Sequence, residues 1–93
     1  MIRNYSNKLT EAVADGTVKK GFPSDLIWRA QMMLTLLDNA VELDDLRSPP
    51  GNHLEALSGN RKGQHSVRIN KQFRICFVWT ATGPEDVEIT DYH

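Results

Sequence analysis

The amino-acid sequence predicts an α+β fold in which N-terminal helices pack on one face of a small antiparallel β-sheet. Up to about residue 46, apolar residues recur at helical spacing, whereas after residue 64 they alternate with polar residues. A Pro-Pro-Gly sequence at residues 49–51 separates the two patterns. Helices followed by strands are typical of α+β proteins. A chain of 93 residues has room for one core, so a single domain over residues 1–93 is expected.

Two helices are expected in the N-terminal half. Ser6 is placed to cap a helix that runs to about Asp15. Ser24 is placed to cap a longer helix, whose apolar positions give the strongest periodic signal in the chain. These positions are Leu26, Ile27, Ala30, Met33, Leu34 and Leu37. Trp28 and Met32, on the same helix, are also expected in the core.

Three strands are expected in the C-terminal half. Residues 64–70 and 73–80 each alternate apolar with polar side chains, so that one face of each strand is apolar. A third run follows the turn signal at residues 83–86 and continues the apolar face. Two shorter elements are compatible with the pattern, namely an opening strand over residues 2–5 and a helical turn over residues 41–46.

The composition excludes several classes of protein. With 40% hydrophobic and 25% charged residues, the chain has enough apolar surface to fold, which disordered chains lack. Its one cysteine cannot form an intramolecular disulfide, and no Cys/His cluster has zinc spacing, so neither a metal nor a cofactor is expected. There is no apolar run of membrane-spanning length and no signal-peptide pattern at the N-terminus. A cytoplasmic protein without a membrane partner is therefore expected.

The positive charges cluster although the formal net charge is only −1. Between residues 61 and 74 there are five cations and no acid: Arg61, Lys62, Arg68, Lys71 and Arg74. Residues 38–45 carry four acids and no cation. A local basic block can bind a polyanion such as RNA, but a solvated charged surface explains the counts equally well.

Two arginines are expected to lie opposite each other in a hairpin whose turn is centred on Lys71. This register pairs Arg68 with Arg74 and keeps the large apolar residues on the core side, whereas a slip by one residue would turn them outward. Like charges in directly opposed positions destabilise a sheet. A phosphate between them would be held by forked hydrogen bonds from both guanidinium groups. We interpret the pair as an anion site, and two solvated arginines screened by salt are the alternative.

The chain ends in Asp91, Tyr92 and His93, three groups that can accept, donate or orient protons. A terminal histidine is by itself a weak signal. The even positions Glu88, Thr90 and Tyr92 are expected to share the sheet face of Arg68 and Arg74. Beside the two arginines, the terminal groups would complete a phosphoryl-transfer site. Such a site needs no metal if the nucleophile is the 2′-hydroxyl of the RNA itself.

Two further residues lie between the Pro-Pro-Gly break and the sheet. His53 and Glu55 either support a substrate or lie on the surface, and the surface interpretation is favoured. Cys76 has no activating neighbour beyond the arginines, so it is a poor candidate for a nucleophile.

Three motifs together resemble one known family. They are Gly-x-Arg-x-Gly at residues 59–63, the Arg-Ile-Asn…Arg-Ile hairpin at residues 68–75 and the terminal Asp-Tyr-His. With the segments around them, they look like the HigB-type toxins of bacterial type II toxin–antitoxin systems, within the RelE superfamily. The similarity covers essentially the whole chain. It implies a RelE-like, microbial-RNase-like fold and a ribosome-dependent endoribonuclease that cuts translated mRNA in the A site.

The resemblance also implies partners and residue roles. The implied partner is an antitoxin, usually a helix-turn-helix protein, through which alone the toxin would reach operator DNA. Arg68 and Arg74 match the arginines that contact the scissile phosphate, and residues 91–93 match the C-terminal active-site residues of the family. The RNA-binding candidates are Arg61, Lys62, Lys71 and His53. A non-catalytic module that binds RNA or antitoxin is the main alternative, and a structural or interaction protein with accidental charges is a third.

Overall fold

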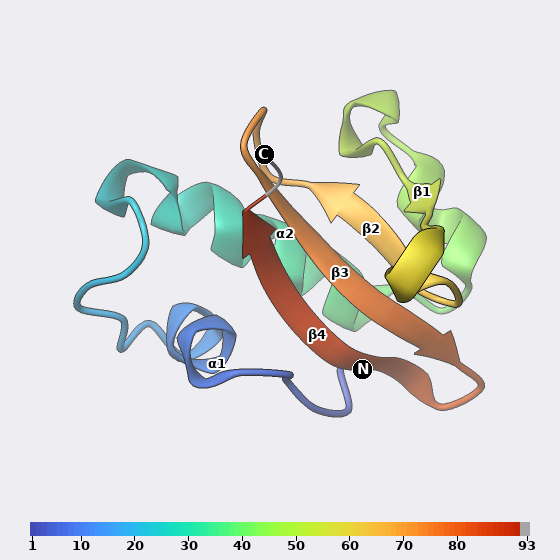
Figure 1. The fold of residues 1–93 in the computed structure, drawn as a ribbon, viewed down its shortest axis with the longest axis horizontal. Helices are drawn as coiled ribbons and strands as arrows, with labels where there is room; N and C mark the ends of the chain where they lie inside the picture. The colour runs from blue at the N-terminus through green and yellow to red at the C-terminus, as the bar shows by residue number, and fades with distance from the viewer. Residues whose placement is uncertain (92–93) are drawn as a thin grey trace.

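The computed structural model describes residues 1–91 and has the predicted α+β architecture, with helix α2 running behind the sheet (Figure 1). The strands form one antiparallel sheet in the order β1-β2-β3-β4, so each strand pairs with its neighbour in sequence. The main elements are α1 (Lys8–Asp15), α2 (Ile27–Asn39), β1 (Glu55–Ala56), β2 (His65–Arg68), β3 (Phe73–Thr80) and β4 (Gly83–Asp91). Four short 3-10 helices lie between them: η1 (Ser24–Leu26), η2 (Leu43–Arg47), η3 (Pro50–Asn52) and η4 (Gly59–Arg61).

The core lies between the two helices and one face of the sheet. The predicted apolar face of β2, β3 and β4 contributes Val67, Ile75, Phe77, Val87 and Ile89 to the core. Burial itself does not alternate along β3, because Arg74 and Cys76 on the opposite face are buried as well. The buried apolar side chains are Val13, Phe22, Ala30, Met33, Leu34, Leu37, Leu46, Val67, Ile69, Ile75, Phe77, Val87 and Ile89. The opposite face of the sheet carries the arginine pair.

The helix starts differ from the predicted ones. Asn7, one residue after Ser6, caps α1, because its Oδ1 accepts a hydrogen bond from the Thr10 main-chain nitrogen at 2.9 Å. Ser24 caps nothing through its side chain and instead begins the 3-10 turn that precedes α2. Trp28 is 72% exposed, so its expected place in the core is wrong. Met32 is also exposed.

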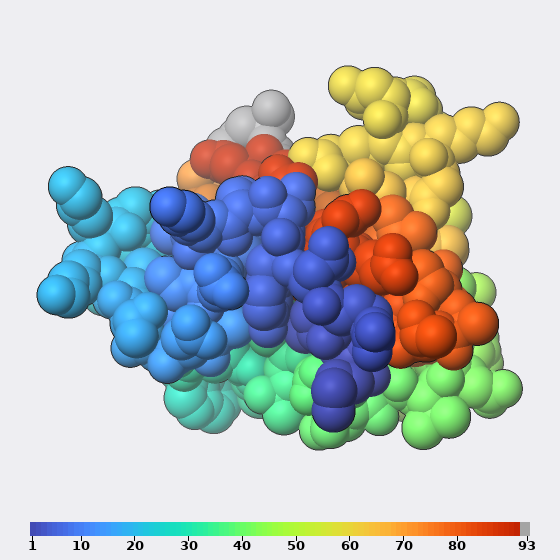
Figure 2. Space-filling view, turned by 90° about the horizontal axis from the view of Figure 1, so that it is seen from below, coloured from blue at the N-terminus to red at the C-terminus, as the bar shows by residue number. Residues whose placement is uncertain are grey.

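The N-terminal segment does not form the expected strand. It runs along β4 with a single parallel bridge between Tyr5 and Val87, and the Arg3 main-chain nitrogen donates to the Pro84 carbonyl at 2.8 Å. Figure 2 shows this segment packed against the C-terminal strand. The turn expected at residues 83–86 is also wrong, because β4 already begins at Gly83.

The acidic stretch at residues 38–45 contains a carboxylate that accepts hydrogen bonds from main-chain nitrogens of the same stretch. The Asp45 carboxylate accepts hydrogen bonds from the main-chain nitrogens of Val41 and Glu42, both at 3.0 Å, at the start of the 3-10 helix η2. These bonds hold the pKa of Asp45 below its ordinary value. Asp38 accepts from the Ile2 main-chain nitrogen at 2.7 Å and so ties the N-terminal segment to the end of α2. The expected helical turn over residues 41–46 is thus a 3-10 helix.

Candidate functional site

The arginine pair has the predicted register. Arg68 in β2 lies opposite Arg74 in β3, and Arg74 lies opposite Thr90 in β4. Residues opposed in an antiparallel sheet point to the same face, so both arginines lie on the side away from the helices. The hairpin therefore brings two guanidinium groups to one surface.

Arg74 is buried, so the alternative of two solvated arginines is wrong for this residue. The residue is only 8% exposed. Its Nε donates to Ser66 Oγ at 2.8 Å, and its Nη2 donates to the main-chain carbonyl of His53 at 2.6 Å. Glu55 Oε1 lies 3.6 Å from the same Nη2 and forms an ion pair with it. A buried charge requires such partners, because its desolvation would otherwise be costly.

Arg68 is only partly buried, and its hydrogen bonds are longer than those of Arg74. Its Nε donates to the Asn70 carbonyl at 3.1 Å, within the hairpin turn. Its Nη1 lies 3.3 Å from Nε2 of His53. Since a guanidinium group only donates, this bond requires an unprotonated Nε2 and a proton on Nδ1 of the ring.

His53 therefore contacts both arginines from a loop. It follows the 3-10 turn η3 and has φ 47° and ψ 55°, in the left-handed region. Asn52 before it is buried and donates to the carbonyls of Leu46 and Ser48, at 3.2 and 3.1 Å, which holds the loop against the domain. Sequence reasoning placed His53 among the RNA-binding candidates and missed its carbonyl as a partner of Arg74. No pattern in the sequence marks a main-chain acceptor of this kind.

The other basic candidates, Arg61, Lys62 and Lys71, lie in or next to the segments that precede and follow β2. Arg61 Nη2 pairs with Glu88 Oε2 at 3.4 Å, and its Nη1 donates to Gln64 Oε1 at 3.0 Å, so Arg61 connects η4 to β4. Lys62 follows η4 and Lys71 lies in the hairpin turn, and both are exposed. Exposed lysines at these positions can reach a phosphate backbone without losing an internal contact.

The three C-terminal candidates are not all brought to the arginines. Asp91 lies opposite Phe73 and therefore on the other face of β4 from Thr90, which shares the face of Arg74. Its Oδ2 accepts a hydrogen bond from Gln72 Nε2 at 3.0 Å. Tyr92 and His93 lie outside the described residues, so their predicted roles stay predictions.

The arrangement can hold an oxyanion. One guanidinium group is fixed by protein acceptors and the other is partly open, and both lie on one sheet face. Fixed donors that need not reorganise are well suited to the charge that develops on a phosphoryl group. Within residues 1–91, no three His, Cys, Asp or Glu side chains lie together as a metal site would require. No helix in this part of the chain is long and apolar enough to cross a membrane.

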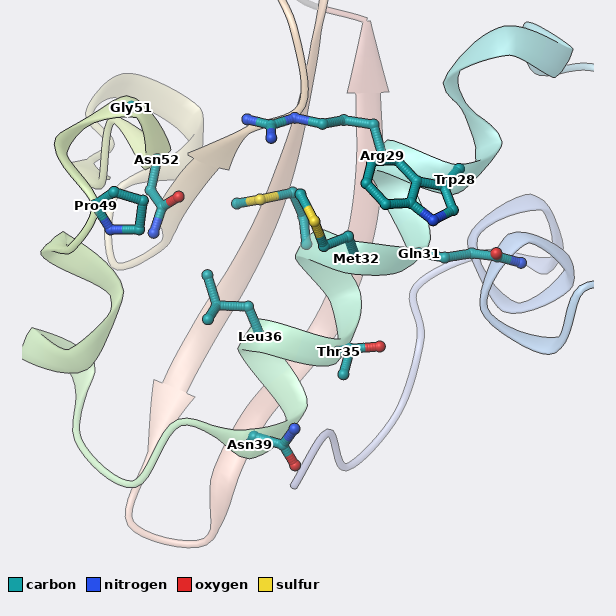
Figure 3. A pocket seen from close by; sticks show the side chains of 11 residues that line it. Trp28, Arg29, Gln31, Met32, Thr35, Leu36, Asn39, Pro49, Gly51 and Asn52 are labelled. Carbon is teal, nitrogen blue, oxygen red and sulfur yellow. The ribbon is translucent and has the colours of Figure 1, made fainter.

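A separate cavity of about 860 Å³ lies beside α2 (Figure 3). Side chains of α2, including Trp28, Met32 and Leu36, line one side, and the loop with Pro49 and Asn52 lines the other. Neither arginine of the pair lines it. The cavity is thus separate from the arginine pair.

Comparison with known proteins gives a consistent result. A family model described as the RelE-like toxin of type II toxin–antitoxin system HigB matches residues 4–93. A protein named Toxin HigB-1 from Vibrio cholerae is 54% identical over 46 residues, which cover 50% of this chain and 48% of the relative. An uncharacterized protein from Haemophilus influenzae is 36% identical over 62 residues, covering 67% of this chain and 61% of the relative. A protein named Endoribonuclease HigB from Proteus vulgaris is 26% identical over the full length of both chains. The chain thus aligns with about half of the Vibrio relative and with the whole Proteus relative.

Proposed function

The chain belongs to the HigB-type, RelE-like toxin family of type II toxin–antitoxin systems, and from this membership we propose that it is an endoribonuclease acting on translated mRNA. The proposed reaction depends on the ribosome and cuts the message in the A site. The observation that carries the proposal is the pairing of Arg68 with Arg74 on one face of the sheet. The full-length similarity to a protein named as an endoribonuclease supports the same chemistry.

The reaction we propose uses the RNA's own nucleophile. The 2′-oxygen attacks the adjacent phosphorus, the bond from phosphorus to the 5′-oxygen breaks, and a 2′,3′-cyclic phosphate and a 5′-hydroxyl are left. Arg68 and Arg74 neutralise the additional charge on the pentavalent phosphorane. No metal is required on this route, because the guanidinium groups supply the positive charge.

Protons must leave the 2′-hydroxyl and reach the departing 5′-oxygen. The family resemblance assigns this work to Tyr92 and His93, with Asp91 orienting His93. A phenol and an imidazole can each serve as acid or base.

The proposed partners follow from the same family. A helix-turn-helix antitoxin would neutralise the toxin in the cytoplasm and carry it to operator DNA. RNA would be bound mainly through its phosphates by the exposed residues Lys62 and Lys71, together with Arg61 and with His53 beside the arginine pair. Contacts of this kind release counterions, so RNA affinity should fall steeply as salt is added.

The test is cleavage of a defined mRNA on purified, programmed ribosomes, read by primer extension. New cut ends at A-site codons with wild-type protein, and none on a message with 2′-deoxyribose at the cut site, are the expected result. A protein that binds ribosomes or antitoxin but produces no cut ends would instead be a non-catalytic module.

A further inference from the structure

The two opposed arginines lean in opposite directions along the hairpin. Arg68 bends toward the turn, because its Nε donates to the Asn70 carbonyl at 3.1 Å. Arg74 bends away from the turn, because its Nε donates to Ser66 Oγ at 2.8 Å. Ser66 comes two residues before Arg68 in β2, and so lies about 7 Å along the strands from the arginine pair. The two hydrogen bonds therefore draw apart guanidinium groups that start from directly opposed positions.

Ser66 is buried although it points to the sheet face that carries the arginines. It lies opposite Cys76, and both residues are 0% exposed. A buried hydroxyl needs a hydrogen-bond partner, and a charged donor gives one of the stronger bonds. The backbone of Ser66 is also fixed on both sides, since β2 pairs with β1 and with β3. The Ser66 hydroxyl is therefore a well-anchored acceptor for Arg74.

The guanidinium group of Arg74 is held at two of its nitrogens. Besides the bond from Nε, its Nη2 donates to the His53 carbonyl at 2.6 Å and pairs with Glu55 at 3.6 Å. A guanidinium group is planar and rigid, so contacts at two nitrogens fix the direction of all its N–H bonds. The bond at Nε is nearest to the aliphatic stem. Ser66 therefore determines toward which end of β3 the Arg74 side chain runs.

We propose that Ser66 is a positioning residue, which acts through Arg74 and sets the separation of the two guanidinium groups that hold the scissile phosphate. This assignment rests on the proposed endoribonuclease function. The charge of a reacting phosphoryl group is spread over several oxygens, so donors stabilise it only where they are aimed correctly. The Ser66 hydroxyl itself neither touches the RNA nor transfers a proton. Its loss should slow the chemical step and leave RNA binding intact.

The test deletes the hydroxyl and compares the result with deletion of a neighbouring γ atom. Ser66→Ala and Cys76→Ala each remove one γ atom from a fully buried residue of the same row. Both variants are assayed by single-turnover cleavage on programmed ribosomes over a range of toxin concentrations. Urea unfolding measures the stability that each variant loses. If Ser66→Ala does not fold, Ser66→Cys takes its place, because sulfur is only a weak acceptor.

The maximal rate of Ser66→Ala should fall by about tenfold to a hundredfold, because a small misplacement of an aligned group has an effect of this size. The toxin concentration that gives half the maximal rate should stay near the wild-type value. Cys76→Ala should cleave at a rate near that of wild type, even at an equal loss of stability. In an Arg74→Lys background, Ser66→Ala should lower the rate little further, because the group that it positions is already absent.

Three results would overturn the assignment. A Ser66→Ala rate equal to that of Cys76→Ala would show that the hydroxyl does not act on the reaction. Rate losses that multiply fully in the double variant would show that Ser66 acts independently of Arg74. A raised half-maximal concentration at an unaltered maximal rate would place Ser66 in RNA binding. Each of these leaves the proposed function intact, whereas wild-type protein that produces no cut ends would refute that function and this assignment together.

Discussion

The main-chain carbonyl of His53 accepts a hydrogen bond from Arg74 at 2.6 Å, while the ring of the same residue contacts Arg68 at 3.3 Å. One loop residue therefore holds two cations that are opposed across the hairpin. Together with Glu55 and Ser66, it offsets much of the repulsion expected between like charges. The pair thus has structural partners as well as an arrangement suited to phosphate.

The two arginines should differ in their effect on stability. Arg74→Lys replaces two separate donors, Nε to Ser66 Oγ and Nη2 to His53 O, with one ammonium nitrogen in a buried site, and should lower the free energy of unfolding by about 1–3 kcal/mol. Arg68→Lys, at the more open position, should change it by less than about 0.5 kcal/mol. Urea unfolding of both variants measures the difference. Equal losses would show that Arg74 is not the structural member of the pair.

Both arginine variants should lose activity. Removing one preorganised donor from a developing oxyanion typically costs about a hundredfold to a thousandfold in rate. Growth inhibition on overexpression should therefore disappear with Arg68→Lys even though the protein stays folded. A folded Arg68→Lys variant that is as toxic as wild type would contradict the phosphate-site interpretation.

His93 should matter for the rate and not for the fold. His93→Gln keeps the chain length and a hydrogen-bonding side chain, and should slow single-turnover cleavage by about a hundredfold to ten-thousandfold. The melting temperature should stay almost unaltered, because glutamine keeps the hydrogen-bonding capacity of the side chain. A rate that falls while ribosome affinity holds would place His93 in the transition state. Near-wild-type rates would leave Tyr92 alone with the proton transfer.

The Asp45 cap should make stability depend on acid pH. Hydrogen bonds from the Glu42 and Val41 main-chain nitrogens lower the pKa of Asp45 from its ordinary value of 3.8, so the ionised form stabilises the folded state. Its contribution is present above about pH 3.8 and is lost as the pH falls through the lower folded pKa. Denaturant unfolding of Asp45→Ala should therefore show a loss at pH 7 that shrinks at pH 2.5. A difference from wild type that is independent of pH would rule out this cap.

Gly83 should not tolerate a side chain. Its φ is +127°, and a Cβ built there would lie 2.2 Å from the Met1 carbonyl oxygen, which is main chain and cannot rotate away. Gly83→Ala should cost about 1–3 kcal/mol of unfolding free energy. Gly51→Ala is the matched control, because a Cβ there meets nothing within 4 Å. If both variants have the same free energy of unfolding, the N-terminal segment can move away from the new side chain without loss of stability.

Some features of this protein were predictable because they depend on local pattern. The change from helical to alternating spacing predicted the order of helices and strands, and the alternation predicted the register that opposes Arg68 and Arg74. Errors arose where neighbouring residues compete for one role. Ser6 and Asn7 are both good caps, and only the geometry of α1 selects Asn7. Trp28 is apolar, but periodicity does not reveal how far the neighbouring elements cover α2.

The sequence alone thus determined the fold class, the hairpin and the family resemblance, since each depends on residues close together in the chain. Tertiary structure alone decided that Arg74 is buried, that His53 joins both arginines and that Glu55 borders the site. These contacts join a loop to strands 15 and 21 residues further along the chain. They depend on a left-handed backbone at His53 and on the packing of Asn52, for which spacing and composition carry no signal.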